Sequence, residues 1–151
     1  MAQHLTDLSH AGEHDVVFEN AQARERTQIL FNHANQVGGI VVGTGDLSEL
    51  ALGWATFNAD QMANYNVNAS VPKTLMAYLV RWYALHRAQT NLAVVLQAVL
   101  DTPISPELIP PKNGEISQRT EDLVGPYELH DFFLYHWLRF GASPTKIFAL
   151  A

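Results

Sequence analysis

One short apolar run in this chain has the pattern of a strand rather than of a helix. Residues 40–42 are Ile-Val-Val, which is too short a run for a stable helix and is rich in β-branched side chains. Such a run is typical of a strand that is buried on both faces. We therefore predict a strand over residues 39–43, and its backbone groups require partner strands.

This predicted strand leads through a glycine-rich turn into a helix. Residues 43–45 are Gly-Thr-Gly, and glycine permits backbone angles and close approaches that larger residues resist. Asp46 and Glu49 follow at the spacing of a capping box, and apolar residues continue at helical intervals to Trp54. We predict a helix over 46–54. In an open α/β sheet, such a turn lies where the strands end, beside a helix N-terminus that favours anions.

Helical periodicity predicts further helices on both sides of this unit. We expect them over about residues 20–36, 72–87, 90–100, 127–140 and from 144 to the end of the chain. Gly38 and Gly141 are the expected stops of two of these helices. Pro72 is suited to a first helical turn, with Ser70 as a possible cap.

Three stretches lack a clear helical pattern. Residues 16–18, Val-Val-Phe, are interpreted as a short strand or an extended entry, and the asparagine-rich residues 55–71 as a long loop. Residues 103–115 contain four prolines and are expected to be irregular. The uncapped start and a last helix without a stop signal suggest a piece of a larger α/β domain, mostly helical and with one strand.

Composition narrows the class of protein. A chain of 151 residues fits one domain or most of one, and its net charge of −6 argues against a general nucleic-acid binder. Without cysteine there is no disulfide, iron–sulfur cluster or thiolate zinc site, which is compatible with a cytoplasmic protein. No run approaches the roughly 18 apolar residues of a membrane span, and residues 1–15 lack the apolar core of a signal peptide.

Several polar residues have two interpretations each. Thr44 and Glu49 are either a turn residue and a cap, or a nucleotide contact and a ligand of Mg²⁺ or of a substrate hydroxyl. Lys73 is expected at a helix N-terminus, where a cation is unfavourable unless it meets an anion or is solvated. Arg24 and Arg26 are two apart on a helix, so only one of them is expected to point toward a site.

The histidines and aromatic residues suggest no metal or cofactor motif. His10 and His14 have helical spacing, but Gly12 separates them and no third ligand follows. The chain has no HExxH, Walker A, GxGxxG or GxSxG pattern. We do not expect the histidines to bind metal, and the aromatic cluster within 132–140 is interpreted as core or as a subunit contact.

Five segments, in order, are similar to those of a known family. They are FENAQARERTQILFNHANQ, GGIVVGTGDLSELALGW, YNVNASVPKTL, VLDTPISPEL and TEDLVGPYELHDFFLYHWLRFG. Over about residues 16–151 the chain resembles the synthetase domain of glutamine-dependent NAD⁺ synthetase. The resemblance implies an adenine-nucleotide α-hydrolase-like (Rossmann-like) fold, with residues 1–151 as the carboxyl-terminal portion of that domain.

The resemblance also implies a reaction. The family activates the carboxylate of deamido-NAD⁺ with ATP and Mg²⁺ as an adenylate, and ammonia from a glutaminase domain then gives NAD⁺ and AMP. Adenylation supplies a leaving group, and positioning and charge neutralisation account for much of the catalysis. Members of the family associate as dimers or larger assemblies, so a homo-oligomer is expected, with small-molecule nucleotides as ligands.

Ligand contacts are implied at matching positions of this sequence. For deamido-NAD⁺ they are Asn20, Glu49, Trp54, Ala55, Thr56 and Phe57. For ATP they are Thr44, Lys73 and Ser105, and Glu49 also matches a position that places Mg²⁺. Shorter relatives have a lysine near Phe57 and an aspartate near Asn64, and neither is present here, so the contacts to the nicotinate ring must differ.

Three parts that the resemblance implies are missing from the chain. No Ser-Gly-Gly-x-Asp-Ser pyrophosphate loop occurs in it, and the resemblance places that loop and the glutaminase domain before residue 1. The family's extreme carboxyl end is also not matched. We therefore predict that the isolated chain does not synthesise NAD⁺.

Two other functions are alternatives to a fragment of NAD⁺ synthetase. One is a non-catalytic interaction module, in which helices 72–100 and 127–140 serve assembly. The other is another ATP-pyrophosphatase amidotransferase, such as a GMP or asparagine synthetase.

Overall fold

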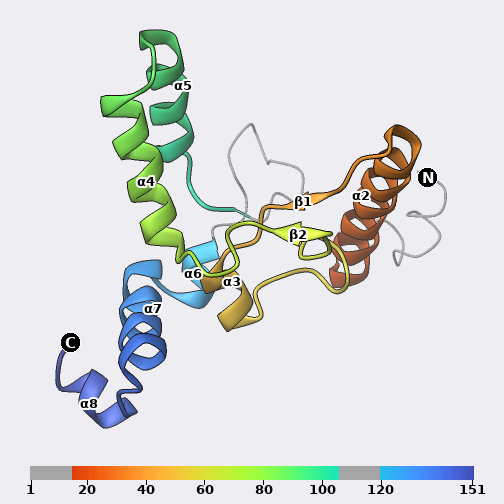
Figure 1. Cartoon of the computed structure of the whole chain (residues 1–151). Helices are drawn as coiled ribbons and strands as arrows, with labels where there is room; N and C mark the ends of the chain where they lie inside the picture. Colours follow the sequence, from red (N-terminus) through yellow and green to blue (C-terminus); the bar gives the residue numbers. More distant parts are fainter. Residues whose placement is uncertain (1–14, 106–119) are drawn as a thin grey trace. The chain divides into compact units, whose positions relative to one another are not determined.

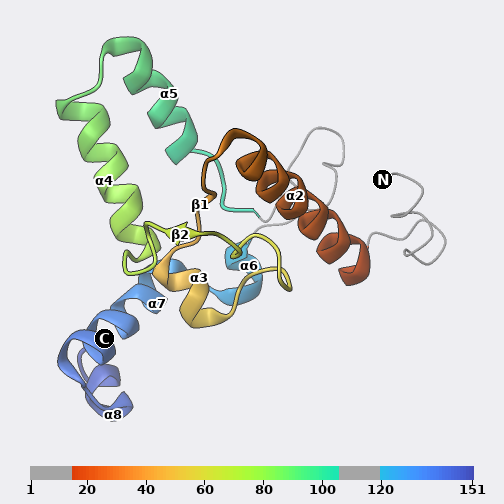
Figure 2. The same ribbon diagram turned by 45° about the vertical axis from the view of Figure 1, so that its right-hand side comes forward.

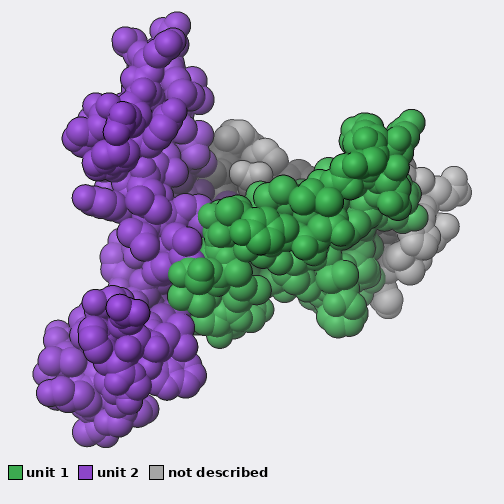
Figure 3. Space-filling model, in the orientation of Figure 1, with its two compact units in different colours: residues 1–70, 107–118 green, residues 71–106, 119–151 purple. Residues whose placement is uncertain are grey.

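The computed structural model describes residues 15–105 and 120–151, which form two compact units. The first, unit 1, contains the described residues 15–70, and the second, unit 2, contains 71–105 and 120–151 (Figures 1 and 3). The expectations for residues 1–14 and for most of the proline-rich segment fall outside the described residues.

Helix α2, Val16–Val37, is the long helix of unit 1. Asp15 starts it, because its side chain accepts a hydrogen bond of 2.9 Å from the backbone N–H of Phe18. The prediction of an extended segment at residues 16–18 is therefore wrong, since this cap starts the helix before residue 20. Gly38 ends the helix in the left-handed region with φ 65°, as predicted.

The predicted strand is present and has a partner. Strand β1, Val42–Gly43, pairs in parallel with β2, Tyr65–Asn66, and Val42 lies opposite Tyr65. Asn64 extends the pairing, because its Oδ1 accepts from the N–H of Val41 at 2.9 Å and its own N–H donates to the oxygen of Val41 at 3.0 Å. The stretch interpreted as a long loop therefore contains the second strand.

Strand β1 is not buried on both faces, contrary to the prediction. Ile40 and Val42 are 64 % and 53 % exposed. Among the described residues β1 has only the two-residue β2 beside it, so its β-branched side chains stay uncovered. Gly43 is buried and is required for space, because a Cβ there would overlap the side chain of Asn66.

Helix α3, Leu47–Leu52, begins with the capping box that the sequence predicts. The Asp46 side chain accepts from the N–H of Glu49 at 2.9 Å, and the Glu49 carboxylate accepts from the N–H of Asp46 at 3.3 Å. Gly53 ends the helix with φ 66°, so the helix is shorter than predicted and excludes Trp54.

Unit 2 contains a hairpin of two helices, α4 (Lys73–His86) and α5 (Thr90–Leu100), which lie side by side in Figures 1 and 2. Pro72 is the N-cap of α4, and neither it nor Ser70 supplies a side-chain cap. Asp131 supplies the acceptor instead. Its Oδ2 accepts from the N–H of Thr74 at 2.8 Å and from the Thr74 hydroxyl at 2.6 Å.

Four short helical segments complete unit 2. They are α6 (Thr120–Val124), which the sequence analysis missed, α7 (Tyr127–Leu134), the π-helix η2 (Tyr135–Arg139) and α8 (Pro144–Phe148). Together α7 and η2 confirm the predicted helix, and Gly141 follows with φ 62°. Ser143 caps α8, which ends before the last residues rather than running to the end of the chain.

Most large apolar side chains of unit 2 are exposed. These include Tyr78, Leu85, Val94 and Val99 of the hairpin, and Tyr135, Trp137 and Phe140 of the aromatic cluster. The interpretation of the aromatic cluster as core is therefore wrong for these three side chains, and the subunit contact stays a prediction. Within the described part of the chain, no helix combines the length and apolar character needed to cross a membrane.

Candidate functional site

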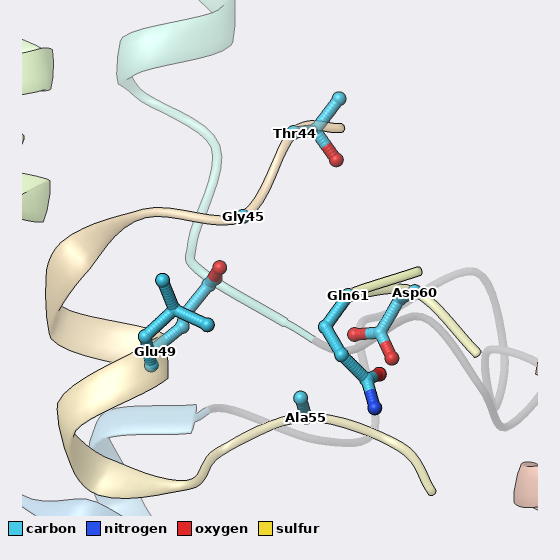
Figure 4. A pocket seen from close by; sticks show the side chains of 7 residues that line it. Thr44, Gly45, Glu49, Ala55, Asp60 and Gln61 are labelled. Carbon is cyan, nitrogen blue, oxygen red and sulfur yellow. The ribbon is translucent and has the colours of Figure 1, made fainter. Parts of the chain in front are cut away.

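Unit 1 contains a small cavity where the turn after β1 meets the loop after α3. It has a volume of about 130 Å³ and is lined by Thr44, Gly45, Glu49, Leu50, Ala55, Asp60 and Gln61. In Figure 4, Glu49 lies on one side of this space and Asp60 and Gln61 on another, with Thr44 and Gly45 at the turn. Residues from three predicted segments therefore converge on one place.

The capping box holds Glu49 at the wall of this cavity. Asp46 is only 1 % exposed, and its bond with Glu49 closes the first turn of α3. The bond from the N–H of Asp46 goes to Oε2 of Glu49 at 3.3 Å. The two interpretations of Glu49 are therefore compatible, because the residue caps α3 and also lines the cavity.

The strip of residues 54–57 is held by side chains from two directions. The Asn20 Oδ1 accepts from the N–H of Phe57 at 2.7 Å, and Arg24 donates to the oxygen of Phe57 at 3.3 Å. Asp60 accepts from both the backbone N–H and the hydroxyl of Thr56. The backbone of the strip is thus fixed, while the Phe57 side chain is 68 % exposed.

The predicted deamido-NAD⁺ residues have different places in this arrangement. Glu49 and Ala55 line the cavity. Asn20 does not line it but bonds the strip that does. Trp54, which is half-buried, and Thr56 and Phe57 flank Ala55 without lining the cavity themselves. These contacts remain predictions.

The predicted ATP residues fall in both units. Thr44 lines the cavity of unit 1, whereas Lys73 and Ser105 belong to unit 2. Lys73 is the first residue of α4, and its Nζ lies 5.1 Å from the ring centroid of Tyr127, a cation–π contact. Ser105 is half-buried.

The structure adds site residues that the sequence analysis did not name as such. Asp60 and Gln61 line the cavity, and Arg24 is the arginine of the pair that bonds the strip. The signal available for the first two was the polar composition of residues 55–71, a long loop of the kind that tends to be functional. Among residues 15–105 and 120–151, no group of three or more histidine or acidic side chains is placed to hold a metal ion.

Two solved structures share the fold. NMN synthetase from Francisella tularensis matches with a TM-score of 0.65 and 26 % identity, over 87 % of this chain and 48 % of that one. Glutamine-dependent NAD⁺ synthetase from Acinetobacter baumannii, solved with ADP, matches with a TM-score of 0.56 and 23 % identity, over 99 % of this chain and 24 % of that one. The short parallel sheet with helices is therefore a partial Rossmann-like α/β fold.

Sequence comparison gives the family. Glutamine-dependent NAD⁺ synthetase from Mycobacterium leprae is 56 % identical over 136 residues, which is 89 % of this chain, and that from Mycobacterium tuberculosis is 56 % identical over 140 residues, or 91 %. The chain spans about a fifth, 20 %, of the length of these relatives. The model of the NAD synthase family matches residues 1–149, so the chain belongs to the NAD synthase family.

Proposed function

We propose that residues 1–151 are the carboxyl-terminal portion of the synthetase domain of a glutamine-dependent NAD⁺ synthetase, and that the cavity of unit 1 is part of its nucleotide site. One observation carries the proposal: Thr44, predicted for ATP, and Glu49 and Ala55, predicted for deamido-NAD⁺, line the same cavity. Its volume of about 130 Å³ is well below the roughly 300–1,000 Å³ of a complete ligand pocket, so it would hold one part of a ligand.

The chemistry proposed for this site is the ATP-dependent amidation of deamido-NAD⁺ through an adenylate. Thr44 would donate its hydroxyl to an ATP oxygen, and Glu49 would accept from a hydroxyl of deamido-NAD⁺. Glu49 carries carboxylate oxygens of the kind that Mg²⁺ prefers, so this residue fits the ion. When bound, Mg²⁺ would neutralise charge on the substrate phosphates. Lys73 and Ser105 remain proposed ATP contacts on the strength of the resemblance alone.

The glutaminase domain that supplies ammonia would belong to a longer protein, since the chain covers about 20 % of its relatives' length. The chain would also associate with copies of itself. The observation that favours assembly is the exposed apolar surface of α4 and α5, because large exposed patches of this kind usually mark interaction sites. A purely non-catalytic assembly module is the second candidate function.

Titration calorimetry with deamido-NAD⁺ separates these functions. The proposed function requires measurable binding to the chain, and Glu49→Gln should weaken it by about tenfold to a hundredfold, since hydrogen bonds to a charged group contribute about 1.5–3 kcal/mol. Glutamine retains an acceptor oxygen for the cap, so α3 should persist. Glu25→Gln, on α2 and away from the cavity lining, is the matched control. A chain that oligomerises but binds no nucleotide would support the assembly module instead.

We expect no NAD⁺ synthesis by the isolated chain. The sequence lacks the Ser-Gly-Gly-x-Asp-Ser loop that the family uses to bind pyrophosphate. A coupled assay with ATP, Mg²⁺, deamido-NAD⁺ and ammonia measures this directly, because added ammonia removes the need for a glutaminase domain. Turnover by the pure chain above a buffer blank would overturn the expectation.

A further inference from the structure

Asp60 is an exposed residue that both lines the cavity and holds the backbone beside it. It lines the cavity beside Gln61, and its Oδ1 accepts from the backbone N–H of Thr56 at 2.9 Å and also from the Thr56 hydroxyl. The two bonds close a loop over residues 56–60. Ala55, the residue before Thr56, lines the same cavity, so the bonds of Asp60 fix the backbone next to a wall residue.

The other side of this loop is fixed by helix α2. Asn20 and Arg24 hold the N–H and the oxygen of Phe57. Ala59 is fully buried and packs with Ala23 of α2. Asn58, between these anchors, has φ 51° in the left-handed region, which asparagine tolerates better than most residues. The backbone of this loop is therefore held in one conformation. Of the side chains that hold it, Asp60 is the one that also lines the cavity.

We propose that Asp60 is a positioning residue for deamido-NAD⁺ and acts through Thr56 rather than on the ligand. This inference rests on the proposed function, because it assumes that the strip of residues 54–57 forms the wall of the deamido-NAD⁺ site. Without Asp60, Thr56 would lose two hydrogen bonds, and the backbone at Ala55 would no longer be held in one conformation. The ligand would then bind a wall that has first to be ordered.

A double-mutant cycle on the 151-residue chain tests this inference, with deamido-NAD⁺ affinity measured by calorimetry well below the unfolding midpoint. Asp60→Ala should weaken binding about fivefold, the effect of roughly one net hydrogen bond. Thr56→Val should weaken it less, because the backbone bond to Asp60 remains. The double variant should bind no more weakly than Asp60→Ala, since both changes remove the same contact.

Asp60→Asn provides the conservative rescue. Its amide oxygen still accepts from Thr56, so binding should return to within about twofold of wild type, within the scatter of independent effects. Two results would overturn the inference, because each would mean that the carboxylate contacts the ligand directly. In the first, the losses of affinity of the two single variants multiply in the double variant. In the second, Asp60→Asn binds deamido-NAD⁺ as weakly as Asp60→Ala.

Two further outcomes separate this inference from the proposed function. If Asp60→Ala lowers the unfolding midpoint but leaves affinity unchanged, Asp60 is structural only, and the inference alone fails. If the wild-type chain itself shows no binding, the proposed function fails and this inference falls with it.

Discussion

Replacing Asp131 by alanine should lower the free energy of unfolding of unit 2 by about 3 kcal/mol, because hydrogen bonds to a charged group contribute about 1.5–3 kcal/mol each. Asp131 is 6 % exposed, and its Oδ2 holds both the N–H and the hydroxyl of Thr74. Helix α4 has no side-chain cap from its own flanking residues. The negative charge of Asp131 also offsets the unfavourable interaction between the positive charge of Lys73 and the N-terminal end of that helix.

Urea unfolding measures this loss, followed by the fluorescence of Trp82 in α4 after Trp54 and Trp137 have been replaced by phenylalanine in all variants. Asp131→Asn keeps an acceptor oxygen and should cost clearly less than alanine. Asp122→Ala removes an exposed aspartate of α6 and is the matched control, with an expected change within about 0.5 kcal/mol. Equal midpoints for Asp131→Ala and Asp122→Ala would show that the bonds to Thr74 do not stabilise unit 2.

The features that the sequence predicts correctly are those that depend on a few neighbouring residues. Asp46 and Glu49 of the capping box are three positions apart, and both members and their bonds are present. Gly38 and Gly141 mark chain reversals because glycine takes positive φ without a Cβ penalty. Thr44 and Glu49 are candidate site residues in the same local pattern, and both line the cavity.

The features that were missed depend on partners that are distant in the sequence. Strand β2 consists of Tyr65 and Asn66, which have no apolar alternation, and it exists through pairing with β1. The cap of α4 comes from Asp131, 57 residues from Thr74. Tertiary contacts of this kind override local propensity, so no short window of sequence contains them.

The candidate site divides in the same way. The turn that places Thr44 is local, but the wall that Ala55 forms depends on Asn20 and Arg24, 37 and 33 residues away from Phe57. Arg24 and Arg26 could not be separated by sequence, because either could face the site. Only the docking of α2 against Ala59 selects Arg24.

Gly43→Ala is expected to cost about 2 kcal/mol of stability in unit 1, within the 1–3 kcal/mol of overpacking in a filled site. A Cβ at Gly43 would overlap the side chain of Asn66 and lie 2.8 Å from the Cβ of Ala63. The Asn66 side chain could rotate away, but the Ala63 Cβ moves only with its backbone. The strain therefore acts on the pairing of β1 with β2.

The same change should weaken deamido-NAD⁺ binding, because the turn that carries Thr44 follows Gly43 directly. Gly39→Ala is the matched control, since among the described residues a Cβ there would meet a side-chain atom of Val37 at 3.4 Å and the oxygen of Ala34 at 3.9 Å. It should leave affinity unchanged and shift stability by less than about 1 kcal/mol. Urea unfolding and calorimetry measure both quantities. If Gly43→Ala behaved like Gly39→Ala, the close contact of β1 with β2 would not be what requires glycine at residue 43.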